Sequence, residues 1–196
     1  SDKLLIYLQG GGACWSTLCL AFEDSHTGIP TAGMLNRELE GNPFADWNVG
    51  YLPYCDGSLF VGDVEVDQDD DGATDRYHRG LLNLTAGLEV IQADFPNPPE
   101  IMITGLSAGA YGAPLAGMLA RSVWPEVPIT VLTDGGLGLG RPGEPGFITG
   151  ILKEWGVYSM VPDSCENCFG DGHATSLATW GLERDESYQY LVISSY

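Results

Sequence analysis

The chain has 196 residues, 44% of them hydrophobic, which is enough to bury the core of one domain. Its 27 acidic and 8 basic side chains give a formal net charge of −19, which argues against nucleic acid or an anionic membrane surface as partner. No apolar run approaches the length of a membrane span, and the chain begins almost at once with strand residues, so we expect a trimmed start. A neutral or heavily esterified substrate suits this charge better than a polyanion.

Short apolar strands and helix-compatible segments alternate along the chain. The helix predicted over 80–94 has its leucines and isoleucine along one side, as expected of a crossover helix on a parallel sheet. This alternation predicts an α/β fold in one domain spanning 1–196. Strands are expected over 4–8, 48–54, 100–104, 128–133 and 188–195, and helices over 80–94, 110–122 and 147–155.

The first predicted strand ends in three glycines, Gly10 to Gly12. Backbone amides of Gly12 and Ala13 could turn toward a reacting oxygen and form half of an oxyanion hole. A tight turn or a phosphate cradle would use glycines as well. Because no Gly-Lys-Ser/Thr follows them, a nucleotide-binding loop is disfavoured.

The five cysteines form two close pairs and one separate residue, Cys55. We predict disulfides Cys14–Cys19 and Cys165–Cys168, and with them an oxidising setting that is extracellular or periplasmic. A zinc site would use the same four sulfurs, but the first spacing is loose for one. Cys55 could find a partner outside the chain.

An acidic segment follows the second predicted strand. Carboxylates at alternate positions precede Gly72 in the D-x-D-x-D-G order of a calcium loop. The twelfth position is His78 rather than Glu, and a strand-like segment precedes the loop, so this is not an EF-hand. A solvated hairpin tip is the alternative to a structural calcium site, whose expected ligands are Asp67, Asp69, Asp71 and Asp75.

The run from Ile101 to Gly112 has the layout of a nucleophile elbow. A β-branched strand leads into Gly105-Leu106-Ser107-Ala108-Gly109, and small residues follow it. A serine on so sharp a turn projects its hydroxyl above the sheet, and glycines let the neighbouring backbones pass. Ser107 is therefore the candidate nucleophile. The amide of Ala108, at a helix N-terminus, is a further oxyanion donor.

The segment 135–182 is rich in glycine and proline, and we interpret it as a cap-like insertion before the last strand. It contains a literal G-x-G-x-x-G match from Gly138 to Gly143. A dinucleotide-binding loop leads directly into a helix, and Pro142 and Pro145 prevent a helix at this position. A dinucleotide site is therefore disfavoured.

Several of these features occur together and in order, and the chain resembles the pectin acetylesterase family, which also contains the Notum carboxylesterases. The most specific segment is Tyr54-Cys55-Asp56-Gly57-Ser58. The other matching segments are Gly10 to Gly12, Asn42-Pro43, Trp47-Asn48, Gly62-Asp63, Arg79-Gly80, the elbow, and Asp134-x-Gly136.

This resemblance implies an α/β-hydrolase-like serine esterase with Ser107 as nucleophile and the amides of Gly12, Ala13 and Ala108 in the oxyanion hole. A tryptophan usually follows the glycine run in the family. Here Ala13 follows it and Trp15 stands two places on, so the acyl pocket could be shaped differently. Trp15, Asp56 and Asp134 are candidate pocket residues, although Asp56 and Asp134 could equally serve in turns.

Family members place the acid of the catalytic triad just after the strand that closes this chain, and the histidine further on. We therefore expect the domain to be incomplete at its C-terminus, with a second chain as one possible carrier of the absent residues. An elbow serine needs such a base and acid to act. His26 and His78 lie in loop or hairpin segments, and His173 with Asp171 or Asp134 is the alternative triad.

The expected activity is hydrolysis of O-acyl esters through an acyl-enzyme on Ser107, with no catalytic cofactor. The first-choice substrate is an O-acetyl group on a polysaccharide such as pectin. A Notum-like esterase for longer acyl chains is the first alternative. A non-catalytic carbohydrate-binding module or pseudo-enzyme is the second, and the aromatic residues Trp15, Trp47, Tyr51 and Tyr54 would suit sugar stacking in it.

Overall fold

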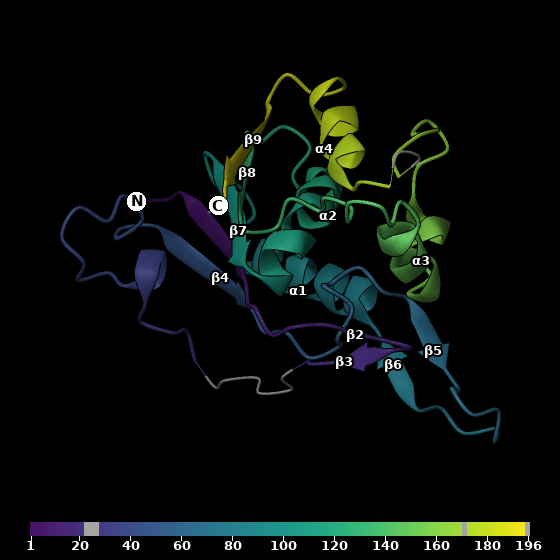
Figure 1. The fold of residues 1–196 in the computed structure, drawn as a ribbon. Helices are drawn as coiled ribbons and strands as arrows, with labels where there is room; N and C mark the ends of the chain where they lie inside the picture. Colours follow the sequence, from purple (N-terminus) through teal and green to yellow (C-terminus); the bar gives the residue numbers. More distant parts are fainter. Residues whose placement is uncertain (22–27, 170–171, 195–196) are drawn as a thin grey trace.

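A computed structural model describes residues 1–21, 28–169 and 172–194. Its centre is a five-stranded sheet in the order β4-β1-β7-β8-β9, with every neighbouring pair parallel (Figure 1). The α/β prediction is confirmed, and the arrangement is consistent with an α/β-hydrolase-like core. The strands are β1 (Leu4–Leu8), β4 (Asn48–Leu52), β7 (Ile101–Leu106), β8 (Ile129–Asp134) and β9 (Tyr188–Ile193).

Helices and two small antiparallel hairpins complete the described part of the chain. None of these helices is both long and apolar enough to cross a bilayer. The helices are α1 (Gly80–Asp94), α2 (Ala108–Val123), α3 (Phe147–Glu154) and α4 (Thr175–Leu182), with the short 3-10 turns η1 (Gly33–Leu35) and η2 (Val157–Met160). The hairpins pair β2 (Cys14–Trp15) with β3 (Leu18–Cys19) and β5 (Val64–Val66) with β6 (Arg76–His78).

The helices α1, α2 and α4 pack on one face of the sheet. A Cβ added to Gly50 of β4 would lie 2.6 Å from Cδ1 of Ile91 in α1, and one added to Gly117 of α2 would lie 2.5 Å from Cγ2 of Val131 in β8. Gly50 and Val131 are on the same face of the sheet. Ile6 of β1 pairs with both Gly50 and Ile103, and Ile103 of β7 pairs with Val131. Glycine at these positions lets helix and sheet approach closely.

The main core lies between this face and the helices. It is built from the alternate residues of each strand, as the two-residue period of a strand requires. Its buried side chains include Leu4, Ile6, Leu8, Ile103, Val131 and Trp124.

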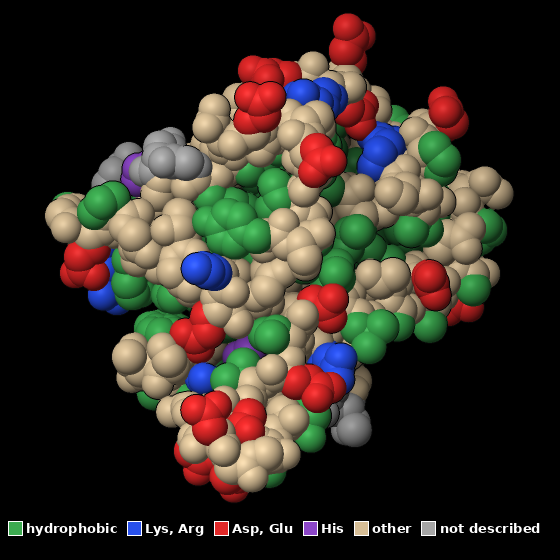
Figure 2. Space-filling view, turned by 90° about the vertical axis from the view of Figure 1, so that its right-hand side faces the viewer, with side chains coloured by type: hydrophobic (Ala, Val, Ile, Leu, Met, Phe, Trp, Pro, Cys, Tyr) green, Lys and Arg blue, Asp and Glu red, His purple; other side chains and the backbone are tan. Residues whose placement is uncertain are grey.

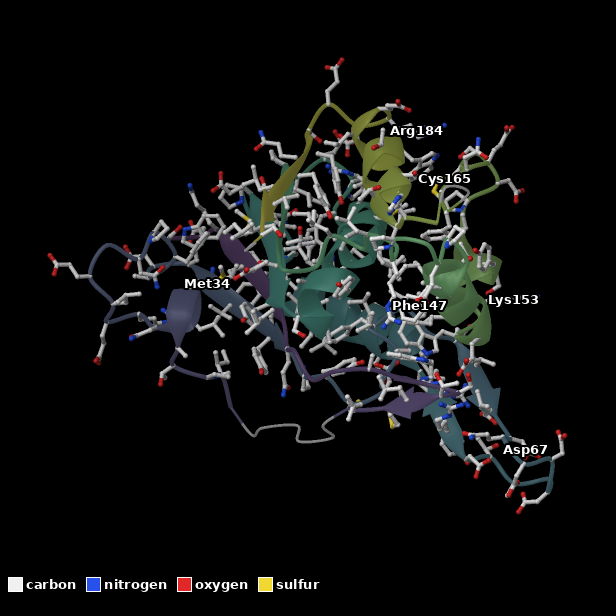
Figure 3. All side chains as sticks on the ribbon, viewed as in Figure 1. Met34, Asp67, Phe147, Lys153, Cys165 and Arg184 are labelled. Atoms are coloured by element: carbon white, nitrogen blue, oxygen red, sulfur yellow. A yellow bond between two sulfur atoms is a disulfide. The ribbon has the colours of Figure 1, made fainter. Side chains whose placement is uncertain are left out.

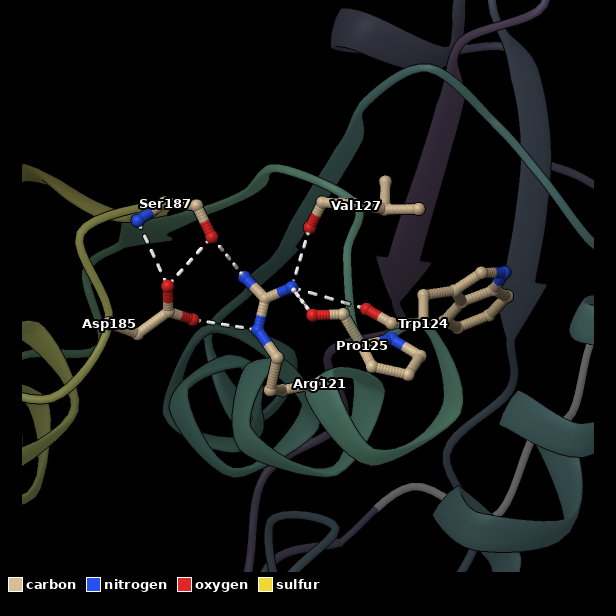
Figure 4. Close-up of polar contacts among 6 residues, drawn as sticks. All are labelled: Arg121, Trp124, Pro125, Val127, Asp185 and Ser187. Atoms are coloured by element: carbon tan, nitrogen blue, oxygen red, sulfur yellow. Dashed lines mark hydrogen bonds and ion pairs between the residues drawn. The ribbon is translucent and has the colours of Figure 1, made fainter.

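Arg121 joins the end of α2 to the segment that leads into β9 (Figure 4). Its Nε donates to the Asp185 carboxylate at 2.7 Å and its Nη2 donates to Oγ of Ser187 at 2.8 Å. Its Nη1 donates to the carbonyls of Trp124, Pro125 and Val127. One guanidinium thereby binds three backbone carbonyls of the connection between α2 and β8 and also holds the residues that precede β9.

The structure corrects some predicted boundaries. The strand predicted over 48–54 ends at Leu52, and beyond it the amide of Tyr54 donates to Oε1 of Gln9 and the Tyr54 hydroxyl donates to the carbonyl of Gly12. The helix predicted from 110 begins at Ala108, directly after the elbow serine. The last strand ends at Ile193, and residues 195–196 lie outside the described part.

Candidate active site

Ser107 occupies the turn between β7 and α2 in a strained backbone conformation. Its φ is 54° and its ψ is −116°, a region that residues with a Cβ rarely adopt. Such strain costs about 1–3 kcal/mol and persists where the surrounding structure enforces it, as at functional sites. The conformation is that expected of a serine at a nucleophile elbow.

Glycines on both sides of Ser107 make this turn possible. A Cβ on Gly105 would lie 2.5 Å from the carbonyl oxygen of Leu8, and a Cβ on Gly109 would overlap the same oxygen. The end of β1 therefore runs directly beneath the elbow, which brings the glycine cluster next to the serine.

The glycine cluster is held in place by a buried tyrosine. The Tyr54 hydroxyl donates to the carbonyl of Gly12 at 3.0 Å and accepts from the amide of Leu59 at 3.0 Å. Tyr54 is 1% exposed, and burial raises its pKa, so the hydroxyl stays protonated as a donor. This positioning role was not predicted, and its only sequence signal is that Tyr54 belongs to the most family-specific segment.

Ser107 opens onto a cavity of about 410 Å³. Gly12, Ala13 and Ala108 line it too, so the predicted nucleophile and all three predicted oxyanion donors border one space. The rest of the wall is mainly apolar. It includes Leu18 and Leu20 near the glycine cluster, Tyr111, Leu115 and Met118 of α2, and Phe147, Ile148 and Ile151 of α3.

Described residues of the segment 135–182, which was predicted as a cap-like insertion, form one wall of this cavity. In Figure 3, Phe147 lies on the side of α3 toward α2, whereas Lys153 points outward. Figure 2 looks onto this side of the molecule, where hydrophobic side chains are visible in the middle of the face and acidic groups lie around it. Trp155 anchors the segment, since its Nε1 donates to the carbonyl of Cys14 at 2.7 Å and its own carbonyl accepts from the amide of Asp63.

Both predicted disulfides are present, Cys14–Cys19 and Cys165–Cys168. The first closes the β2-β3 hairpin, which carries Trp15 and Leu18 on the cavity wall. Cys55 is exposed and outside both disulfides, and its Sγ lies 3.5 Å from Nδ2 of Asn83.

Of the three candidate pocket residues, Trp15 lines the cavity, where its ring meets that of Phe147 edge-on. Asp56 is not among the lining residues. Its carboxylate accepts a hydrogen bond from Ser58, and its backbone carbonyl contacts Nδ1 of His78 at 2.9 Å. Burial raises the pKa of Asp56, and the hydrogen bond from Ser58 opposes that shift.

Asp134 ends β8 in register with Leu106 and Ile193, and it too is outside the cavity lining. Burial raises the pKa of Tyr7, and the charge of Asp134 raises it further, which places the carboxylate near the end of β1.

The two described histidines, His78 and His173, are not among the residues that line the cavity. His78 is 1% exposed and packs beside Trp155, while Nδ1 of His173 accepts from the amide of Gly140 at 2.7 Å. His26 and Asp171 lie outside the described residues. Among the residues that are described, no histidine and no carboxylate lines the space around Ser107.

The acidic loop lies far from the cavity, at the tip of the β5-β6 hairpin, where Figure 3 labels Asp67. Oxygens of Asp67, Asp69 and Asp71 all lie within 4.8 Å of one another, which fits the hard oxygen ligands that calcium prefers. Asp75, the fourth predicted ligand, is not in this group, and its Oδ2 accepts from the amide of Gln68 at 2.7 Å.

The aromatic residues considered for sugar stacking do not form a common surface. Tyr54 is buried, Tyr51 stacks on Tyr7, and Trp47 packs edge-on against Phe44. Only Trp15 of the four lines the cavity.

Comparison with known proteins finds similarity to pectin acetylesterases. The family model described as Pectinacetylesterase matches residues 1–142. Pectin acetylesterases 4 and 11 of Arabidopsis thaliana are each 27% identical to the chain, over 84% of its length. Pectin acetylesterase 7 of the same plant is 26% identical over 64%. The aligned part of the chain spans 44%, 46% and 34% of the length of these relatives.

Proposed function

Because the chain belongs to the pectinacetylesterase family, we propose that the full-length protein is a serine carboxylesterase with Ser107 as its nucleophile. The observation that carries this proposal is the strained backbone of Ser107 at the mouth of a cavity bordered by Gly12, Ala13 and Ala108. A serine held in this way is the expected arrangement for attack on an acyl carbon.

In the proposed reaction, the hydroxyl of Ser107 attacks the ester carbonyl and forms a tetrahedral intermediate. The amides of Gly12, Ala13 and Ala108 donate hydrogen bonds to its oxyanion, a contribution typically worth about 3–4 kcal/mol per donor in such sites. The alcohol leaves with a proton, and water then releases the acid from the acyl-enzyme. A base must take the serine proton, and we assign it to polypeptide outside the described residues.

The first-choice substrate is an O-acetyl group on a polysaccharide such as pectin, since three relatives are named pectin acetylesterases. The two disulfides suit an oxidising compartment, and an extracellular or periplasmic location would place the enzyme with such substrates. The net charge of −19 favours heavily esterified regions, where fewer carboxylates are exposed.

The cavity supports a second candidate, an ester with a longer acyl chain. An acetyl group has two carbons, whereas about 410 Å³ of mainly apolar space falls within the range of about 300–1,000 Å³ typical of sites for larger ligands. Ala13 at the position that the resemblance assigns to tryptophan adds to this space. Initial rates of the full-length protein on p-nitrophenyl acetate and octanoate separate the two candidates, and a higher kcat/KM for octanoate would favour the second.

The test of the esterase proposal itself is labelling with a fluorophosphonate probe, which reacts only with an activated serine. We expect the full-length protein to be labelled at Ser107 and the Ser107→Ala variant to remain unlabelled. Ser58→Ala is a matched control, because Ser58 is fully buried and outside the cavity lining. Absence of labelling in the folded full-length protein would support the pseudo-enzyme or carbohydrate-binding alternative instead.

A further inference from the structure

Arg141 is the only charged side chain among the described residues that line the cavity next to Ser107. The chain has 8 basic residues and 27 acidic ones, so a lone cation at this place runs against the overall charge. The walls around it are mainly apolar, and an apolar acyl group needs no cation. The charge of Arg141 is therefore available to a different part of the substrate.

Stacking on an aromatic ring orients the guanidinium of Arg141. Its Cζ lies 3.6 Å from the centroid of the Phe147 ring, and Phe147 in turn meets Trp15 edge-on. Both rings line the same cavity. A guanidinium stacked in this way keeps the N–H groups at its edge free to bind a carboxylate with two parallel hydrogen bonds. Arg141 therefore needs little further ordering to bind such a group.

Glu144 is the acidic neighbour of Arg141 in the described structure, and it holds the guanidinium weakly. Its Oε2 lies 3.7 Å from Nη1 of Arg141, which is beyond hydrogen-bond distance, and the side chains are 59% and 55% exposed. Exposed ion pairs of this kind contribute little. A ligand carboxylate at hydrogen-bond distance can therefore replace Glu144. The same exposure places Arg141 at the opening of the cavity rather than at its floor.

We propose that Arg141 binds a carboxylate on the alcohol part of the ester that Ser107 attacks. The acyl group enters the apolar interior, so the alcohol part lies toward the opening, where Arg141 is. This inference rests on the proposed esterase function and names a substrate class for it, O-acylated sugars that carry a carboxylate, such as uronic acids. The net charge of −19 still repels a long polyanion. The expected substrate thus has a free carboxylate beside the ester and is esterified elsewhere.

Ligand binding to the full-length protein with Ser107→Ala tests the proposal without hydrolysis. The two ligands are O-acetylated trigalacturonates whose acetylated sugar carries either a free carboxylate or its methyl ester, the other two sugars being esterified. Calorimetric titration should give a Kd about tenfold lower for the free carboxylate. This ratio should fall as salt is added, because exposed charges are screened. Adding Arg141→Gln should bring the two Kd values together.

Arg184→Gln in the same background is the matched control. Arg184 also stacks on an aromatic ring, with its Cζ 4.7 Å from the centroid of Trp180, but it is outside the cavity lining and lies away from Phe147 in Figure 3. This variant should keep the tenfold ratio. Arg141→Lys keeps the charge and loses the paired N–H groups, so its ratio should be intermediate.

Equal Kd values for the two ligands before Arg141 is changed would overturn the proposal, as would absence of binding by both. So would a ratio that survives Arg141→Gln or is lost in Arg184→Gln. If Arg141→Gln does not fold, Arg141→Lys decides, and an undiminished ratio in it would contradict the proposal. Failure of the esterase proposal is distinguishable, because fluorophosphonate labelling of the wild type reports on Ser107 and the Kd ratio reports on Arg141.

Discussion

Gly10 packs directly against Ser107. A Cβ added to Gly10 would lie 3.4 Å from Cβ of Ser107 and 2.5 Å from the carbonyl oxygen of Leu106. The loop after β1 and the elbow after β7 therefore touch through backbone, and this contact sets the distance between the proposed oxyanion amides and the serine.

The first prediction follows from this contact. Gly10→Ala should destabilise the protein by about 1–3 kcal/mol, because the new methyl group overlaps backbone that cannot move aside. It should also reduce fluorophosphonate labelling of Ser107 by displacing the elbow. Urea unfolding and labelling of the full-length protein measure the two effects.

Gly150→Ala is the matched control for this change. Gly150 lies inside α3 with open space where its Cβ would be. The substitution should raise stability by about 0.5–1 kcal/mol, since alanine is the better helix former. A Gly10→Ala variant as stable and as reactive as this control would contradict the prediction.

Ser107→Gly should separate stability from reactivity. Glycine adopts positive φ without a steric cost, so the substitution relieves the backbone strain of the folded state. It also raises the entropy of the unfolded chain, which opposes this effect, and the net gain in stability should be about 1 kcal/mol. Ser107→Ala keeps the Cβ and hence the strain, and it should show no such gain. Both variants should lose labelling. Equal unfolding midpoints for the two would show that the elbow stores no strain.

The sequence predicted the elbow and the parallel sheet because both depend on local patterns. Glycine spacing around Ser107 and β-branched runs in the strands leave few alternative structures. The contacts of Tyr54 could not be predicted in this way, since its partners Gly12 and Leu59 meet it only through the fold. Asp56 was predicted near the pocket because it lies in the family-specific segment, but the same turn buries its carboxylate against Ser58.

Arg121→Ala should lower the free energy of unfolding by about 2–3 kcal/mol. The change removes five hydrogen bonds from a partly buried guanidinium and leaves three carbonyls to find new donors. Lys3→Ala is the control, because the Lys3–Glu100 ion pair is exposed and such pairs contribute about 0–1 kcal/mol. Urea denaturation of both variants provides the comparison, and similar losses would mean that the Arg121 contacts contribute little.

The raised pKa of Asp56 predicts a pH dependence of stability. Burial raises the pKa of this carboxyl above its ordinary value of 3.8, so just above that pH the folded state binds more protons than the unfolded state. The contribution of Asp56 to stability must therefore fall as the pH rises from 3.8 through the folded-state pKa. Asp56→Asn removes the titration, and unfolding curves across this pH range should show a smaller fall for the variant. An unchanged slope would contradict the assignment.

Calcium binding by the acidic hairpin is the last prediction. Asp67, Asp69 and Asp71 direct oxygens to one point, and Oδ1 of Asp67 is buried with no hydrogen-bond partner in the described structure. Dissociation constants of about 10⁻⁴–10⁻³ M are typical of extracellular calcium modules, so 10 mM calcium should stabilise the folded state by about 1–3 kcal/mol. Calorimetric titration should give heat with the wild type and none with Asp69→Ala/Asp71→Ala. Asp46→Ala, outside the hairpin, should titrate as the wild type does. A wild type without heat or stabilisation would leave the segment as a solvated hairpin tip.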